Sequence, residues 1–270
     1  MQTHRARRIV AAEWRGSSLP VVVETDAGPF VTKLRGAAQG TAALVAEIVV
    51  ASLAEAIGLR VPERALVALD PGVACDDRHA ELADLLGRSR GTNLGFRLLE
   101  GARDLRPGDV ARVGRDLASA IAWLDGLVMN PDRTPRNPNL LVDERDLWLI
   151  DHGAALPFQH DWASLTEESP RAAAAPPSRH VLHERASAVD EWDPLLAAAL
   201  DRDRLRAAVS EVPDDFLSPL LPPSAGVAAL PRRRDAYVAF LWKRLRPPRP
   251  FVRAGLHAAS AAGGAAPGAL

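Results

Sequence analysis

The chain has 270 residues, of which 47% are hydrophobic and 25% charged, so it can form one large domain or two lobes around a buried core. Its formal net charge of -1 gives no electrostatic case for binding nucleic acid or an anionic membrane. The single cysteine, Cys75, excludes an internal disulfide framework and fits a reducing compartment. No apolar segment is typical of a secretory signal or a membrane-spanning helix, so we expect a cytoplasmic protein.

The N-terminal part of the chain predicts a small antiparallel sheet. Apolar, β-branched segments at 7–14 and 19–27 are followed by a turn signal, Asp-Ala-Gly-Pro, and by a third extended segment at 30–34. Lys33 lies on this third strand. It is one of only two lysines among 33 cationic residues, which marks it for a separate explanation.

A helix is predicted next, with Thr41 as its N-cap and Gly58 at its C-terminal end, because apolar residues between them repeat at helical spacing. Glu47 borders the apolar face of this helix. An acid there needs a cationic partner, since an unpaired buried carboxylate is costly, and Lys33 is only one short loop upstream. The alternative is a solvated glutamate at the edge of the apolar stripe.

The remaining pattern predicts further strands and helices around a lobe boundary near residue 95. We expect an N-lobe over 1–95, a mainly helical C-lobe over 96–248 and a disordered tail over 249–270. The predicted elements are a strand at 61–69, a helix at 76–90, an extended connector at 93–101, a helix at about 110–129 capped by Asp109, a surface loop at 164–180, and helices at about 183–210 and 231–246.

The most distinctive segment runs from 129 to 153. Three of the chain's four asparagines lie between positions 130 and 139, in a polar, proline-rich loop. Apolar segments at 139–142 and 147–150 then predict a β-hairpin, which ends in Asp151-His152-Gly153. Taken alone, Asn-Pro-Asp is a common turn signature, and an acid after a strand can simply cap that strand.

Taken together, the polar residues indicate phosphoryl transfer from ATP. This chemistry needs a lysine held by a helix acid, an aspartate beside the attacking hydroxyl, and an asparagine and a second aspartate for magnesium. The chain has these types in the order used by protein kinases: Lys33, Glu47, Asp132, Asn137 five residues later, and Asp151. The joint order and spacing carry this interpretation.

The segments at 132–141 and 147–153 resemble the HipA-like kinases, specifically a compact bacterial branch. Looser similarity extends from the Lys33 strand to Gly153 and includes 36–40, 58–62 and 93–95. The resemblance implies an α+β, bilobal, protein-kinase-like fold with a β-rich N-lobe and a mainly helical C-lobe. It also implies ATP- and Mg²⁺-dependent phosphorylation, usually of a Ser or Thr hydroxyl on a protein partner.

The same resemblance assigns roles to the five polar residues. Asp132 is the expected catalytic acid/base, Asn137 and Asp151 are the expected metal ligands, and Lys33, held by Glu47, contacts the nucleotide phosphates. Alternatives that keep the architecture are a pseudokinase or nucleotide-binding regulatory module, and a small-molecule kinase of related fold.

Three features depart from the family pattern. Thr134 stands where better-known members have a histidine two residues after the catalytic aspartate. No clear glycine-rich phosphate loop precedes Lys33, and the nearest candidates are 16–18 and 36–40. The chain is also shorter than the toxin-type members. The last two departures leave the nucleotide clamp and the phosphate acceptor open.

Overall fold

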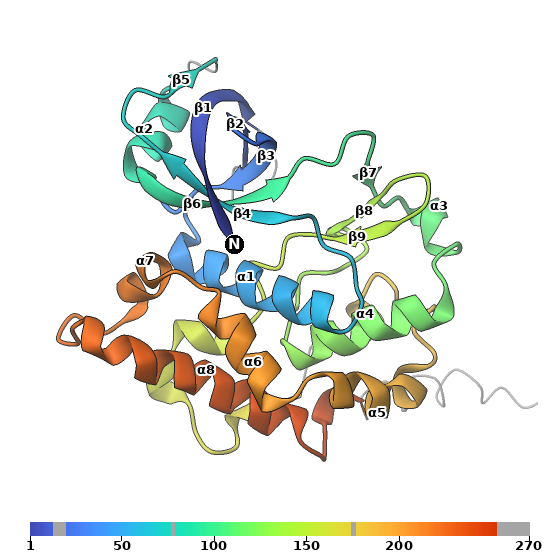
Figure 1. The fold of residues 1–270 in the computed structure, drawn as a ribbon. Coiled ribbons are helices and arrows are strands. Elements are labelled where there is room, and N and C mark those ends of the chain that lie inside the picture. Colours follow the sequence, from blue (N-terminus) through green and yellow to red (C-terminus); the bar gives the residue numbers. More distant parts are fainter. Residues whose placement is uncertain (13–19, 77–78, 174–176, 253–270) are drawn as a thin grey trace, which may run out of the picture.

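The computed structural model describes residues 1–12, 20–76, 79–173 and 177–252, and combines a curled β-sheet with a layer of helices (Figure 1). The sheet has the strand order β2-β3-β6-β4-β1-β5, and β1 also pairs with β2, so the sheet closes on itself. Its strands are β1 (Gln2–Ala12), β2 (Val21–Thr25), β3 (Gly28–Lys33), β4 (Arg64–Leu69), β5 (Ala74–Cys75) and β6 (Gly91–Arg97). The predicted antiparallel pairing of the first three segments is confirmed, with Lys33 at the end of β3.

Strand β6 corrects the predicted connector at 93–101. It lies between β3 and β4 and pairs antiparallel with both, placing Leu94 opposite Lys33. The polar Asn93 and the small Gly95 interrupt the apolar pattern by which a strand is recognised in a sequence. Both fit their positions: Asn93 is buried and accepts the Arg35 backbone N–H at 2.9 Å, while a Cβ on Gly95 would come within 2.7 Å of a neighbouring side chain.

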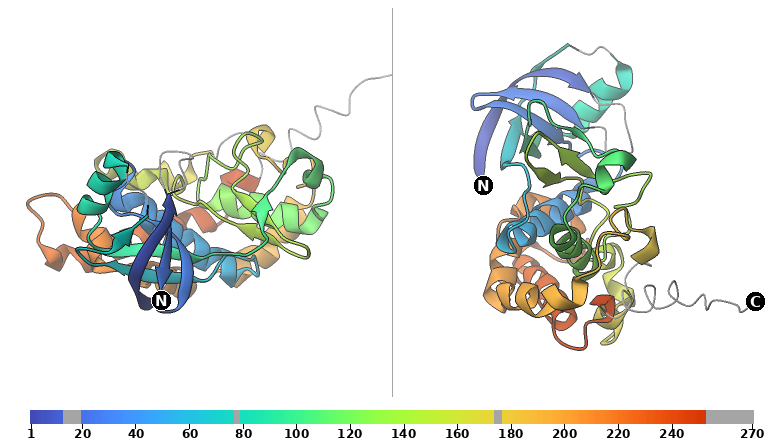
Figure 2. Two further views of the ribbon diagram at one scale, coloured as in Figure 1. Left: turned by 90° about the horizontal axis from the view of Figure 1, so that it is seen from above. Right: turned by 90° about the vertical axis from the view of Figure 1, so that its right-hand side faces the viewer.

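Helix α1 (Gly40–Ala56) runs between the sheet and the helices of the C-terminal part of the chain, as Figures 1 and 2 show. It is buried on almost every face, because the sheet side and the helical side both cover it. The predicted N-cap, Thr41, is wrong: Gln39 occupies that position without a side-chain cap bond, and Thr41 lies inside the first turn. Gly58, with φ +81°, has the left-handed conformation expected just beyond a helix end.

The other α-helices are α2 (Ala80–Arg88), α3 (Pro107–Val110), α4 (Arg115–Leu127), α5 (Val189–Ala199), α6 (Arg202–Ser210), α7 (Asp214–Leu217) and α8 (Leu230–Leu245). Short 3-10 turns follow as η1 (Pro157–His160), η2 (Trp162–Ser164), η3 (Ser169–Arg171), η4 (Pro177–Arg179), η5 (Ser218–Leu220) and η6 (Val227–Ala229). The helix predicted over 110–129 is α4, which begins only at Arg115 because its N-cap, Gly114, has an extended conformation; the short α3 precedes it. Asp109 lies inside α3, where it accepts the Arg106 backbone N–H.

A second, small sheet contains β7 (Arg103–Asp104), β8 (Leu140–Val142) and β9 (Leu147–Leu149), in that order. The predicted hairpin is therefore confirmed as β8–β9. Its turn is fixed by Asp143, whose carboxylate accepts two backbone N–H groups and the Trp148 indole N–H at 2.8 Å. This hairpin delivers the chain to Asp151.

The C-terminal end of the described chain is packed rather than free. Arg249 makes a bidentate ion pair with Asp193, and Phe251 is buried against Trp123 and Gly126. Most of the predicted disordered tail, and the candidate phosphate loop at 16–18, fall outside the described residues. The division into two lobes stays a prediction. Within the described ranges, every helix is too short or too polar to cross a bilayer.

Candidate active site

Three charged residues from three distant parts of the chain meet at Lys33. Its Nζ atom binds the carboxylate of Glu47 on α1 and lies 2.6 Å from Asp151 Oδ1, just beyond β9. Lys33 is 9% exposed and Glu47 is fully buried. The predicted Lys33–Glu47 ion pair is confirmed, and its cause is the one expected, a buried acid that needs a cation.

The two carboxylates keep the lysine charged. Burial opposes the charge of Lys33, but Glu47 and Asp151 outweigh it and raise the pKa of the ammonium group. Burial disfavours the charged form of Glu47 and so raises the pKa of its carboxyl, and the nearby Lys33 offsets this rise only in part. Burial opposes ionisation of Asp151 too, yet its ion pair with Lys33 lowers the pKa of that carboxyl. The site therefore presents a fixed ammonium group beside an ionised aspartate.

The loop with Asp132 is a tight turn closed by hydrogen bonds. Thr134 and Asn137 exchange backbone N–H···O bonds of 3.0 Å, which returns the Asn137 side chain to the acid. Asp132 Oδ2 accepts from Asn137 Nδ2 at 2.8 Å and from Asn139 Nδ2 at 3.2 Å. Its other oxygen, Oδ1, has no donor among the described residues. The five-residue spacing thus brings the asparagine amide to the aspartate and leaves one carboxylate oxygen available.

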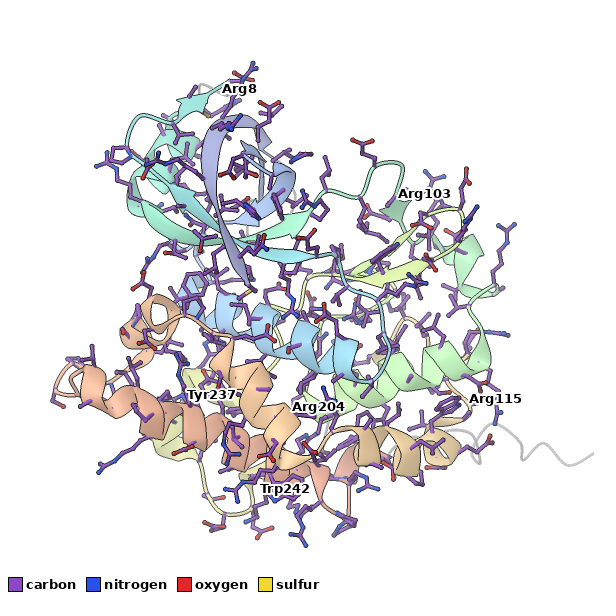
Figure 3. The ribbon with its side chains drawn as sticks, in the orientation of Figure 1. Arg8, Arg103, Arg115, Arg204, Tyr237 and Trp242 are labelled. Carbon is purple, nitrogen blue, oxygen red and sulfur yellow. The ribbon has the colours of Figure 1, made fainter. Side chains whose placement is uncertain are left out.

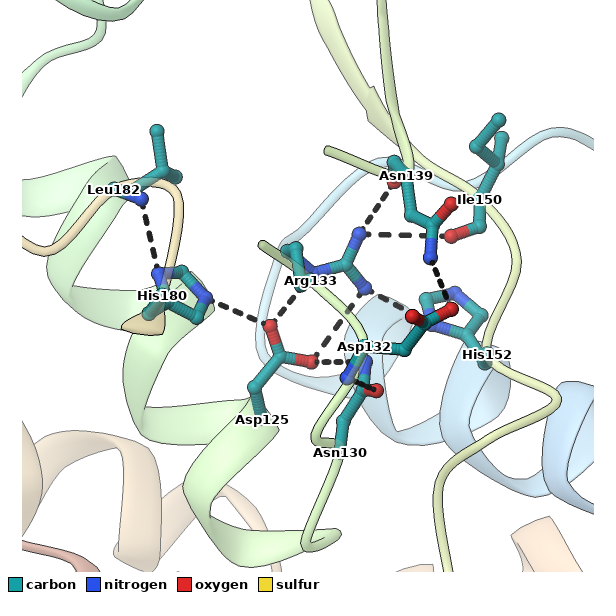
Figure 4. Close-up of polar contacts among 9 residues, drawn as sticks. All are labelled: Asp125, Asn130, Asp132, Arg133, Asn139, Ile150, His152, His180 and Leu182. Atoms are coloured by element: carbon teal, nitrogen blue, oxygen red, sulfur yellow. Dashed lines mark hydrogen bonds and ion pairs between the residues drawn. The ribbon is translucent and has the colours of Figure 1, made fainter. Parts of the chain in front are cut away.

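A buried arginine, Arg133, connects this loop to the Asp151 segment (Figure 4). Arg133 is 1% exposed, and its Nε atom lies 2.6 Å from Asp125 Oδ2 on α4. Its Nη1 atom donates to the backbone carbonyl of Asn139, and its Nη2 atom lies 3.2 Å from His152 Nδ1. The Arg133 guanidinium therefore contacts His152, the residue after Asp151, and Arg133 itself is the residue after Asp132.

Further contacts fix the partners of Arg133. Asn130 Nδ2 and His180 Nε2 lie 2.9 Å and 3.0 Å from the two oxygens of Asp125 (Figure 4). Burial opposes ionisation of Asp125, but Arg133 and His180 lower the pKa of its carboxyl well below the usual range. Burial and the charge of Arg133 lower the pKa of His152 to about 3, so this imidazole is neutral at pH 7. Since His152 accepts at Nδ1, its proton is on Nε2.

The backbone is strained around the same residues. The described non-glycine residues with positive φ are Met129 (57°), Asn139 (50°), Asp151 (53°) and Leu156 (56°). All four lie in the segment that carries the candidate site. Such conformations cost on the order of 1–3 kcal/mol each and concentrate at functional sites, where surrounding contacts enforce them. Here the Arg133 network and the hairpin supply those contacts.

The sequence interpretation missed most of this network. Asp125, Arg133 and His180 were not singled out, although a charged residue on the apolar face of a predicted helix, as Asp125 is, is a usable signal. The candidate phosphate-loop segment 36–40 lies between β3 and α1. There Gln39 Oε1 lies 3.3 Å from the position that a Cβ on Gly153 would take, so this segment adjoins the Asp151 turn.

Asn137 and Asp151, the predicted metal ligands, carry oxygen donors of the kind that magnesium binds, and their role as ligands stays a prediction. Asn137 is exposed and donates its amide N–H to Asp132, so its amide oxygen is not used in that hydrogen bond. Asp151 adds a carboxylate whose side chain is 36% exposed. Mg²⁺ is commonly held by one or two protein carboxylates plus substrate phosphates and water. The described residues contain no cluster of three or more His, Cys, Asp or Glu side chains, so they provide no all-protein cage.

The α+β fold resembles that of a known kinase. The crystal structure of the Helicobacter pylori proinflammatory kinase CtkA superposes with a TM-score of 0.51, covering 90% of this chain and 95% of that chain at 8% sequence identity. At this identity the likeness concerns the fold. Residues 8–217 match the family model of the HipA-like kinases. The chain therefore belongs to the HipA-like kinase family. No curated protein sequence matches it significantly.

Proposed function

We propose that the protein transfers the γ-phosphate of ATP, with Mg²⁺, to a Ser or Thr hydroxyl on a protein. The observation that supports this best is the way buried charged residues hold the segments of the two acids. Asp151 is held by Lys33, and Arg133 joins the Asp132 loop to His152, the next residue after Asp151. A site in which Lys33 fixes one acid, and Arg133 ties the loop of the other to the residue after it, suits a reaction that depends on positioning and charge.

Each residue has a specific task in this proposal. Lys33 neutralises phosphate charge, and Glu47 prevents it from swinging away, because the buried carboxylate binds the same nitrogen. Asp132 orients the attacking hydroxyl through Oδ1 and accepts its proton, while Asn137 fixes the other carboxylate oxygen. Asn137 and Asp151 supply oxygen ligands for magnesium, whose charge offsets that of the transferred phosphoryl group.

The first test is transfer from γ-labelled Mg-ATP to the protein itself and to a general protein acceptor, followed by identification of the labelled amino acid. Asp132→Asn should lower the rate by about 10²- to 10⁴-fold, the usual contribution of a positioned acid/base. Asp116→Asn is the matched control, since Asp116 is exposed on α4. Label on Ser or Thr supports the proposed acceptor.

A second measurement separates the enzyme from a regulatory module. ATP binding is measured with Mg²⁺ and with EDTA, for the wild type and for Asp151→Asn. We expect Mg²⁺ to strengthen binding in the wild type and to have little effect in the variant. A wild-type protein that binds nucleotide but neither transfers nor hydrolyses the γ-phosphate would replace the kinase proposal with the regulatory reading.

A further inference from the structure

Asp132 is held by two asparagines, and only one of them has a role in the proposed function. Asn137 and Asn139 each donate a side-chain N–H to Asp132 Oδ2, at 2.8 Å and 3.2 Å; Figure 4 draws the Asn139 contact. Asn137 is exposed, whereas Asn139 is only 7% exposed. The asparagine-rich segment 130–139 therefore places a buried amide on the expected base, and magnesium binding does not explain that amide.

The backbone of Asn139 is fixed from two directions. Its carbonyl oxygen accepts a guanidinium N–H of Arg133 and the backbone N–H of Ile150, the latter at 3.1 Å. Its φ of 50° is left-handed, a conformation in which asparagine is enriched among non-glycine residues. Ile150 directly precedes Asp151. Asn139 thus contacts Asp132 through its side chain and the residue before Asp151 through its backbone, so it links the two acids of the candidate site.

The hairpin that begins after Asn139 is anchored as well. The backbone N–H of Leu105 donates to the Leu140 carbonyl at 2.9 Å, which joins β8 to the segment that follows β7. On β7, Arg103, labelled in Figure 3, makes two hydrogen bonds of 2.6 Å and 3.0 Å to the Asp109 carboxylate of α3. Asn139 therefore lies between two fixed elements, the buried arginine network and the small sheet, so its amide has a set position before any substrate binds.

The two amides decide which oxygen of Asp132 can act as the base. Both donate to Oδ2, and an amide N–H cannot accept a hydrogen bond, so a proton on Oδ2 would face two donors. Oδ1 is therefore the oxygen that takes up a proton. In the proposed reaction, the hydroxyl oxygen bonds to the γ-phosphorus, the bond from that phosphorus to ADP breaks, and the hydroxyl proton passes to Oδ1.

We propose that Asn139 is the positioning residue that fixes the Asp132 carboxylate for this proton transfer. The role rests on the proposed kinase function and adds a residue that acts through Asp132 rather than on ATP or metal. Asn137 is exposed and shares its amide group with the predicted metal site, whereas Asn139 is buried and held through its backbone. Asn139 keeps Oδ2 in place through a charge-assisted hydrogen bond, so Oδ1 faces the attacking hydroxyl.

The kinetic test compares γ-phosphate transfer to a general protein acceptor by the wild type, Asn139→Gly and Asn139→Asp. Glycine keeps the left-handed backbone and removes the amide, whereas aspartate keeps the shape and puts a carboxylate oxygen against Asp132. We expect both variants to lower kcat by about ten- to hundredfold, while KM for Mg-ATP and the Mg²⁺ concentration for half-maximal activity change less than about threefold. Asn137→Gly, which removes a predicted metal ligand, should raise the Mg²⁺ requirement.

A measurement without nucleotide checks the contact itself. The chain has four asparagines, so ¹⁵N-asparagine labelling gives four side-chain amide groups to follow by NMR. Asp132→Ala should shift the Asn139 signal, which Asn139→Gly assigns. The Asn93 amide, which donates to the Ser89 and Gly91 carbonyls at 2.8 Å and 3.0 Å, is the matched control. Its signal should stay unchanged, which also shows that the variants are folded.

Three results would overturn the role of Asn139. They are an Asn139 signal that does not respond to Asp132→Ala, an Asn139→Gly variant with the kcat of the wild type, and a rise in KM for Mg-ATP that accompanies the fall in kcat. A wild type that transfers no phosphate would overturn the proposed function, and this role with it. The two failures are distinguishable, because in the first case the wild type stays active.

Discussion

Replacing Arg133 with methionine should destabilise the protein strongly. Arg133 and Asp125 are 1% and 3% exposed, and their atoms lie 2.6 Å apart. Methionine keeps most of the side-chain length but leaves the Asp125 carboxylate with only Asn130 and His180 as partners. Breaking one side of a buried ion pair costs about 3–5 kcal/mol. For a chain of this size, that corresponds to a fall in Tm of roughly 6–20 °C.

The measurement is urea-induced unfolding followed by circular dichroism, for Arg133→Met, Asp125→Asn and the double variant. An asparagine at 125 removes the charge and keeps an acceptor oxygen for only one of the two donors, Asn130 Nδ2 and His180 Nε2. The double variant should therefore lose about 1–3 kcal/mol less than the two single losses combined. Arg136→Met, at an exposed arginine of the same loop, is the control and should change stability by less than about 0.5 kcal/mol.

Two results would refute this reasoning. If Arg133→Met lowered the free energy of unfolding by less than about 1 kcal/mol, the Asp125 carboxylate would not be left buried without its cation. Strict additivity in the double variant would mean that Arg133 and Asp125 do not interact in solution.

Two further predictions concern pH and glycine. His152 has a pKa of about 3 when folded, against 6.5 ordinarily, so the unfolded chain takes up its proton first. The free energy of unfolding should therefore fall as the pH drops below about 6.5, by up to about 1.4 kcal/mol per pH unit. In urea unfolding, His152→Asn should reduce this pH dependence. The control His160→Asn, at an exposed position, should leave it unchanged. Gly36→Ala should lower stability by about 1–3 kcal/mol, because its Cβ would lie 2.7 Å from a side-chain oxygen and 3.0 Å from a backbone carbon. Gly87→Ala, in open space within α2, should raise Tm slightly; a lower Tm would contradict the placement of this glycine.

Local features of the chain were predictable because short-range chemistry fixes them. The β8–β9 hairpin follows from two apolar segments around a polar turn, and the end of α1 follows from Gly58. The Lys33–Glu47 ion pair follows from a buried acid one short loop after a lone lysine. Elements whose apolar periodicity is interrupted by a polar residue or a glycine could not be predicted from that periodicity. Strand β6 was taken for a connector, and the start of α4 only after the extended Gly114 was not anticipated.

The sequence by itself determined which residue types this protein has for phosphoryl transfer, and their order, because the spacing of Asp132, Asn137 and Asp151 reflects one loop and one hairpin. Only the tertiary structure decided how they are held. Arg133 contacts Asp125 on a helix that precedes it and His152 beyond a hairpin that follows it. Those contacts exist only after the chain has folded back, since a buried charge selects its partners by proximity in space rather than along the chain.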